Sequence, residues 1–204
     1  GLPAAVSLLS VFPHAHYLAR KFEVWAKAPG SDDRNVLRID DWDFNWQDEY
    51  VLATPMELPA GTQLSMRVTY DNSAANPRNP NHPPKQVKTG ESSADEMGNV
   101  TFQLVPKDKR AMDLLREHRS RKLVAQDGSA RNYYNLGNAL VDLGRHDEAL
   151  AAYASALEKD PSMVPVHMNL GNLLGMRGDL EGSVREYRLA VKLSPSDASA
   201  RARL

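Results

Sequence analysis

Cysteine is absent from the 204 residues of this chain. Its absence excludes disulfide scaffolds, thiol nucleophiles, zinc–thiolate sites and iron–sulfur clusters. The sequence has no apolar run near the roughly 20 residues that a membrane-spanning helix needs. The 25 basic and 26 acidic residues leave a net charge of −1, so the whole chain has no electrostatic signature of nucleic-acid binding. The first 12 residues are apolar but lack a basic segment, so we expect no signal peptide there.

The composition changes near residue 106. All three tryptophans lie before residue 50. Residues 1–105 hold 9 basic and 13 acidic residues and carry a net charge of −4, whereas the remainder holds 16 and 13 and carries +3. We therefore predict a domain over residues 1–106, a linker helix over 107–128 and a second domain over 129–204. Since no methionine precedes Gly1, we expect the chain to be part of a longer protein.

Short alternating segments dominate the first domain. Apolar and polar side chains alternate with a period of two over residues 21–26, 42–46, 63–70 and 99–105. This period places one set of side chains on each face of a sheet. Proline- and glycine-rich turns separate the segments, as at Pro29-Gly30. The pattern predicts an antiparallel β-sandwich, which we expect to be jelly-roll-like.

The second domain repeats itself with a period of 34 residues. Asn135-Leu136-Gly137-Asn138 returns as Asn169-Leu170-Gly171-Asn172. A fixed period of 34 is typical of tetratricopeptide repeats, and this stretch resembles that family. The resemblance implies an α-helical solenoid with repeats over 130–163 and 164–197 and the start of a third repeat. It also implies a protein or peptide ligand, whose identity the sequence leaves open.

The repeated positions have a physical rationale. Small residues such as Gly137 allow paired helices to approach closely, and Tyr153 and its counterpart Tyr187 fill the groove between neighbouring helices. Pro161 and Pro195 end the second helix of each repeat. Two positions depart from the family pattern, where His167 replaces an aromatic residue and Ser183 replaces alanine.

A connecting helix is predicted over residues 108–124. Asp108 is a plausible N-cap, and Met112, Leu115 and Leu123 suggest an apolar stripe. Basic residues are frequent in this helix, but acidic residues lie among them. We interpret them as a solvated helix face and expect no contact with nucleic acid.

The segment His14-Ala15-His16 suggests a metal site. On a strand, residues i and i+2 point to the same face, so the two imidazoles converge. A third ligand must come from elsewhere. The candidates are His82, Asp95, Glu96 and Met97.

Other candidate groups have simpler explanations. Asp41, Asp43, Asp48 and Glu49 lack the spacing of a calcium loop, which favours a solvated strand face. We expect the remaining groups to be packing or surface residues, namely Trp42, Phe44 and Trp46 in the sheets and His118, His146 and His167 in the helices.

Four motifs appear together in the first domain, at residues 12–18, 41–47, 70–73 and 90–97. In this order they resemble the C-terminal domain of copper type II, ascorbate-dependent monooxygenases. The resemblance implies that His14, His16 and Met97 bind one copper ion. Imidazole and thioether ligands together suit Cu(I).

The resemblance also implies a reaction. In this family the copper activates O2 and hydroxylates a C–H bond, with electrons from ascorbate passing through a second copper. Three histidines of a preceding domain, absent from this chain, hold that second copper, so we expect this chain alone to be inactive. The implied substrate contacts are Asn99, which matches the family, Phe12 and His82. Phe12 replaces an arginine that would pair with a substrate carboxylate.

Three functions remain open from the sequence. The first is the copper-binding half of a monooxygenase, fused to a protein-interaction module. The alternative is a tetratricopeptide-repeat scaffold whose sandwich is a non-catalytic copper-binding module. The third is a copper-binding domain without oxygenase activity. By analogy with such copper proteins in bacteria, we expect a periplasmic or other extracytoplasmic location.

Overall fold

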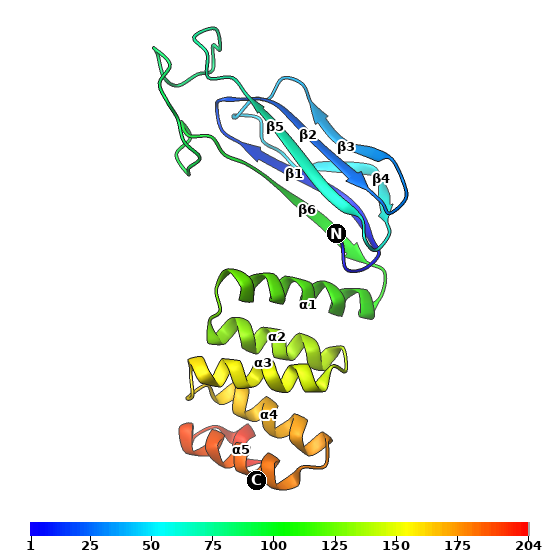
Figure 1. Cartoon of the computed structure of the whole chain (residues 1–204), viewed down its shortest axis with the longest axis vertical. Helices are drawn as coiled ribbons and strands as arrows, with labels where there is room; N and C mark the ends of the chain where they lie inside the picture. The colour runs from blue at the N-terminus through cyan, green and yellow to red at the C-terminus, as the bar shows by residue number, and fades with distance from the viewer. Residues whose placement is uncertain (204) are drawn as a thin grey trace. The chain divides into compact units, whose positions relative to one another are not determined.

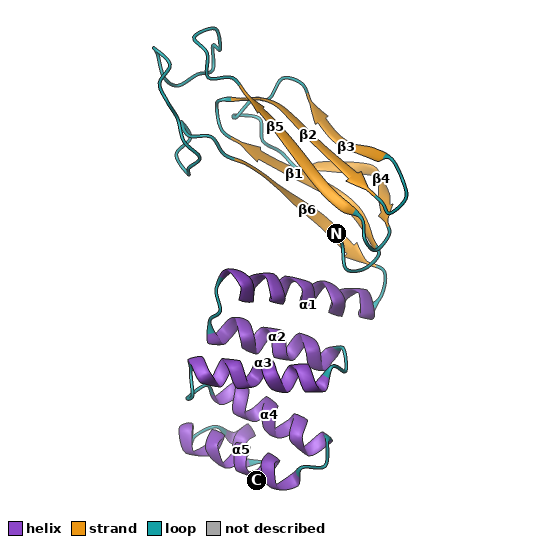
Figure 2. Ribbon diagram, in the orientation of Figure 1, coloured by secondary structure: helices purple, strands orange, loops and turns teal. Residues whose placement is uncertain are grey.

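The computed structural model describes residues 1–203, and the chain forms two compact units, Gly1–Ala111 and Met112–Leu204 (Figure 1). The first unit is built of strands and the second of helices (Figure 2). Within the described residues, no helix combines the length and apolarity needed to cross a membrane.

Six strands form two three-stranded antiparallel sheets in the first unit. One sheet has the order β4-β1-β6 and the other β3-β2-β5. The strands are β1 (Val6–Ala15), β2 (Ala19–Lys27), β3 (Asp33–Ile39), β4 (Tyr50–Leu58), β5 (Gln63–Tyr70) and β6 (Gly98–Pro106). Antiparallel strands are present as predicted, at β2, β5 and β6 among others. A jelly roll is not shown, because each sheet holds only three strands.

The core of the first unit lies between these sheets. Leu8 of β1 and Phe22 and Val24 of β2 are fully buried. The two sheets approach closely at Gly98 of β6, where an added Cβ would lie 2.7 Å from Cγ2 of Val68 in β5. A side chain at position 98 would therefore force the sheets apart.

The predicted strand over residues 42–46 is wrong, because this segment is a loop between β3 and β4. The Asp43 carboxylate accepts a hydrogen bond from the Asn45 backbone N–H at 2.9 Å, which favours a turn over an extended strand. Trp42 is buried as expected, and its Nε1–H donates to the Ala15 carbonyl at 3.1 Å. Trp46, expected to pack in the sheets, is 74% exposed.

Within the described residues, six helices follow the strands, and Figure 1 labels α1 to α5 of them. They are α1 (Lys109–Gln126), α2 (Ala130–Asp142), α3 (His146–Lys159), α4 (Val164–Met176), α5 (Leu180–Leu193) and α6 (Ala198–Arg201). Helices α4 and α5 begin and end 34 residues after α2 and α3. The period read from the sequence is thus the period of the helices. Helices α3 and α5 both end two residues before a proline, as predicted.

Glycine allows the two helices of each repeat to pack closely. An added Cβ at Gly171 of α4 would lie 2.7 Å from Cε1 of Tyr187 in α5, and Gly137 of α2 faces Tyr153 of α3 in the same way. The prediction that these tyrosines fill the groove between helices is confirmed.

Helix α1 begins as predicted but buries a different face. The Ala111 N–H donates to the Asp108 carboxylate at 2.7 Å, so Asp108 caps the helix. Met112, expected in an apolar stripe, is exposed. The buried residues are largely polar, and they include Asp113, Glu117 and Ser120. The predicted stripe is thus wrong at Met112, whereas Leu115 and Leu123 are partly buried. Glu117 can be buried because its carboxylate pairs with Arg121 and Arg145.

Candidate functional site

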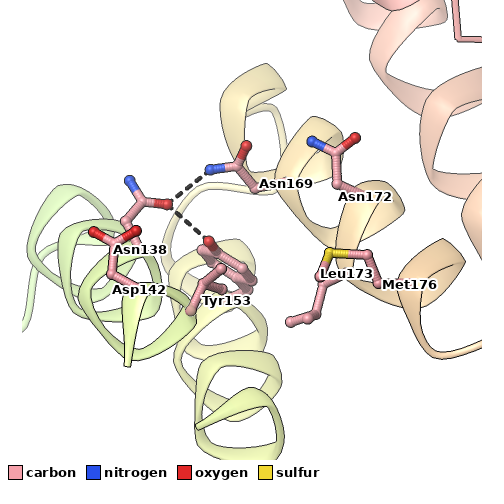
Figure 3. A pocket seen from close by; sticks show the side chains of 8 residues that line it. Asn138, Asp142, Tyr153, Asn169, Asn172, Leu173 and Met176 are labelled. Carbon is pink, nitrogen blue, oxygen red and sulfur yellow. Dashed lines mark hydrogen bonds between the residues drawn. The ribbon is translucent and has the colours of Figure 1, made fainter. Parts of the chain in front are cut away.

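A groove crosses the face of the second unit where α2, α3 and α4 meet (Figure 3). It encloses a cavity of about 210 Å³. The lining residues are Asn138, Val141, Asp142, Tyr153, Asn169, Asn172, Leu173 and Met176. Most come from α2 and α4 at spacings of three and four residues, which place them on one face of each helix.

Asn138 is held by two hydrogen bonds on one side of its amide. Its Oδ1 accepts from the Tyr153 hydroxyl at 2.7 Å and from Asn169 Nδ2 at 2.7 Å (Figure 3). Burial raises the pKa of Tyr153 to about 12, so the hydroxyl keeps its proton and donates. Because Oδ1 accepts from these two donors, the N–H groups of the Asn138 amide point away from them.

The same arrangement recurs one repeat later. Asn172 Oδ1 accepts from the Tyr187 hydroxyl at 2.6 Å and from Arg203 Nη1 at 2.6 Å. Asn172, Tyr187 and Arg203 lie 34 positions after Asn138, Tyr153 and Asn169. The groove therefore presents two asparagine amides in equivalent settings. In the second setting the donor is the Arg203 guanidinium, whereas in the first setting it is the neutral Asn169 amide.

The remainder of the groove is mixed in character. Val141 and Leu173 add apolar surface, and Met176 is 70% exposed. The Asp142 carboxylate accepts from Arg116 of α1 at 3.2 Å, so its charge is partly balanced. Amide donors beside apolar side chains are suited to binding a polar backbone with apolar substituents.

The two predicted histidine ligands lie together in the first unit. His14 lies at the end of β1 and His16 directly follows that strand. Their ring centroids are 5.2 Å apart, as the spacing of two predicts. The His16 backbone N–H donates to the Met97 carbonyl at 3.2 Å, so the structure brings the Met97 backbone beside this pair.

His16 is buried, and its ring orientation is defined. Its Nδ1 lies 3.2 Å from the Asp95 carbonyl oxygen. Because a carbonyl only accepts, Nδ1 carries the hydrogen, and in the neutral ring the lone pair is then on Nε2. The Phe44 ring lies 6.0 Å from the His16 ring, so this expected packing residue lies beside the pair.

The other predicted site residues are more widely spread. Asn99 of β6 pairs with His14 in the strand register, and Phe12 pairs with Thr101. Phe12 is exposed, and His82 is exposed in the loop between β5 and β6. Asp95 meets His16 through its backbone. Across residues 1–203, no three side chains of the histidine, aspartate and glutamate types form a group that could hold a metal ion.

Sequence reasoning missed the groove residues. The motif Asn-Leu-Gly-Asn was used only as the mark of a repeat, although it contains Asn138, Asn169 and Asn172. Its periodicity could have indicated the site, because polar residues that recur on one face of successive repeats line a common surface.

Comparison with known proteins supports the repeat assignment. Residues 134–198 match the family model described as "Tetratricopeptide repeat". A curated relative is the photosystem I assembly protein Ycf3 of Acaryochloris marina (strain MBIC 11017). It is 23% identical over 138 residues, which cover 50% of this chain and 83% of the relative. Residues 134–198, which hold most of α2 to α5, therefore match tetratricopeptide repeats.

Two solved structures are similar at low scores. MamA matches with a TM-score of 0.41 and 22% identity, covering 43% of this chain and 52% of its own. PcrH, solved with the chaperone-binding region of PopD, matches with a TM-score of 0.39 and 22% identity, covering 43% and 66%. The match thus spans about half of the MamA chain. These comparisons give no support to the resemblance with copper monooxygenases.

Proposed function

We propose that this protein is an interaction protein whose tetratricopeptide repeats bind an extended peptide segment in the groove between α2 and α4. The observation that carries the proposal is the pair of equivalent asparagines. Tyr153 and Tyr187 hold Oδ1 of Asn138 and of Asn172, so both amides are oriented before a ligand arrives. Preoriented donors reduce the entropy lost on binding.

The chemistry of the groove indicates how a peptide would sit. The N–H groups of Asn138 and Asn172 would donate to backbone carbonyls one repeat apart. Val141, Leu173 and Met176 would contact an apolar side chain of the ligand. Such contacts would bind an extended peptide backbone without any reaction of the peptide.

The test first selects peptide ligands and then replaces each of the two groove asparagines, Asn138 and Asn172, with alanine. A random peptide library is panned on the full chain, and the affinities of enriched peptides are measured by fluorescence anisotropy. Asn138→Ala and Asn172→Ala should each weaken binding about tenfold, the loss of roughly one oriented hydrogen bond.

Ser155→Ala is the control. Ser155 lies two residues after Tyr153 on α3, is partly exposed and does not line the cavity. The affinity of this variant for the enriched peptides should equal that of the unchanged chain. Enriched peptides that bind the Asn138→Ala/Asn172→Ala double variant at full strength would place the peptide site elsewhere.

A second function is proposed for the first unit, the binding of one copper ion by His14, His16 and Met97. Its support is the convergence of the two rings and the orientation of His16, whose Nε2 is left for a metal by the Asp95 carbonyl. The donor types fit copper, because two imidazoles and a thioether suit Cu(I). Copper bound there would supply one-electron redox chemistry, while the protein would hold the ligands.

X-ray absorption of the Cu(I)-loaded chain tests this site. A sulfur scatterer should be present and should disappear in Met97→Ala. Met66→Ala, on the exposed surface of β5, should keep it. A sulfur signal that survives Met97→Ala rules out Met97 as the ligand.

Oxygenation is the finer form of this second proposal. By the family resemblance, it would require ascorbate, the second copper domain and a location outside the cytoplasm. The chain alone, loaded with copper and given ascorbate and O2, should form no hydroxylated product. Product formation with stoichiometric ascorbate consumption would contradict the need for a second domain.

A further inference from the structure

A histidine and a glutamate form a buried pair in the second repeat. His167 of α4 and Glu186 of α5 meet with Nδ1 2.8 Å from Oε2. The second ring nitrogen, Nε2, lies 3.0 Å from the Pro161 carbonyl oxygen in the turn between α3 and α4. The side chains of His167 and Glu186 are only 7% and 12% exposed.

Hydrogen-bonding capacity determines the protonation state that fits this geometry. A backbone carbonyl only accepts hydrogen bonds, and an ionised carboxylate likewise only accepts. A neutral imidazole has one N–H and would turn a lone pair towards one of these oxygens. Beside an ionised Glu186, only the imidazolium donates to both oxygens, and an unsatisfied buried polar contact is costly.

The first repeat shows that the fold does not require this pair. The positions 34 residues earlier hold Tyr133 and Ala152, which cannot form an ion pair. The same helix packing is thus achieved in the first repeat without charge. The pair is therefore a specific property of the second repeat.

Neighbouring charges do not replace the imidazolium. Arg185 Nε lies 3.8 Å from the other Glu186 oxygen, but its side chain is largely exposed. Asp160, which precedes Pro161, directs its carboxylate to the Ser162 backbone N–H and hydroxyl. Glu186 is therefore the charged group that hydrogen-bonds with the His167 ring.

We propose that His167 and Glu186 form a proton-dependent lock that holds α4, α5 and the turn at Pro161 together. When His167 is protonated, its ring donates to both Glu186 and Pro161, and the lock is closed. When His167 loses its proton, one of its two hydrogen bonds is lost and the second repeat is weakened.

The sign of the pH dependence follows from linkage. In the folded chain the ring proton serves hydrogen bonds to Glu186 and Pro161, and the unfolded chain makes neither bond. The contribution to stability is therefore present at acidic pH and is lost with rising pH, over the interval in which the pair gives up this proton. Over this interval, the unfolding constant of the helical unit should rise by up to about tenfold per pH unit.

Urea unfolding of the full chain, followed by circular dichroism at several pH values, measures this slope. In Glu186→Gln, a neutral ring can donate to Pro161 and accept from the glutamine amide, so the slope should be smaller. The double variant His167→Tyr/Glu186→Ala, which copies the first repeat, should behave in the same way. The other histidines are present in every variant, so their contribution cancels in the difference.

Nitrogen-15 NMR of the unchanged chain tests the lock without a substitution. At neutral pH the His167 ring should show hydrogens on both nitrogens. A neutral ring with one N–H, or the same pH slope in the unchanged chain and both variants, would overturn the proposal.

Discussion

Gly171 of α4 packs directly against the Tyr187 ring of α5. An added Cβ at Gly171 would overlap the ring, and the buried ring has little room to move. We expect Gly171→Ala to lower the free energy of unfolding of the helical unit by about 1–2 kcal/mol. This value is the cost of over-packing less the gain in helix propensity from alanine.

Gly128→Ala is the control for this substitution. Its Cβ would lie 3.6 Å from Cε2 of Tyr133, an ordinary contact. Denaturant unfolding should show a change within about 0.5 kcal/mol for this variant. Equal effects of the two substitutions would show that Tyr187 does not restrict position 171.

Tyr153 gives a second prediction at the residue scale, because burial raises its pKa from 10.0 to about 12. The folded chain then holds this proton more tightly than the unfolded chain. The resulting stability is complete below pH 10 and is lost between pH 10 and pH 12. Circular dichroism should show the helical unit losing stability over this interval, and Tyr153→Phe should lose less. An equal loss in both proteins would contradict the assignment.

At the scale of elements, four charged residues connect α1 to the first repeat. Arg121 of α1 and Arg145, which precedes α3, each pair with both Glu117 of α1 and Glu148 of α3. Glu117 is the most buried member, with a side-chain exposure of 11%. This network explains how α1 can bury Glu117, because both partners of its carboxylate are arginines.

We therefore expect Glu117→Gln to loosen α1. The change leaves Arg121 and Arg145 without their shared carboxylate, and we expect a loss of about 1–2 kcal/mol, between the values for exposed and buried pairs. Hydrogen exchange should show faster exchange of the α1 amides. Asp147→Asn is the control, because Asp147 is largely exposed in its pair with Arg177 and should cause no measurable change. Unchanged α1 protection in Glu117→Gln would show that the network does not hold the helix.

At the scale of the whole molecule, we expect the two units to unfold separately. Each has its own core, and a repeat array is stabilised by contacts between neighbouring repeats. All three tryptophans lie in the first unit, so their fluorescence reports only on the sheets. Urea unfolding followed by tryptophan fluorescence and by circular dichroism of the helices should give different midpoints. Coincident transitions at every pH would indicate one cooperative unit.

The sequence by itself determined the elements whose pattern is local. The 34-residue period predicted the spacing at which α2 and α3 recur as α4 and α5, because each repeat is one helical pair with the same packing requirements. Alternation identified β2, β5 and β6, and the spacing of His14 and His16 placed their rings together. It failed at residues 42–46, where the Asp43 side chain stabilises a turn that alternation cannot detect.

Only the tertiary structure decided which residues of distant segments meet. It paired Asn138 with Asn169 across two repeats, and it placed the Met97 backbone beside His16. It also turned the His167 ring towards Glu186 and Pro161, a contact that no local pattern indicates. These contacts depend on side-chain packing between elements, and periodicity specifies only the face on which a residue lies.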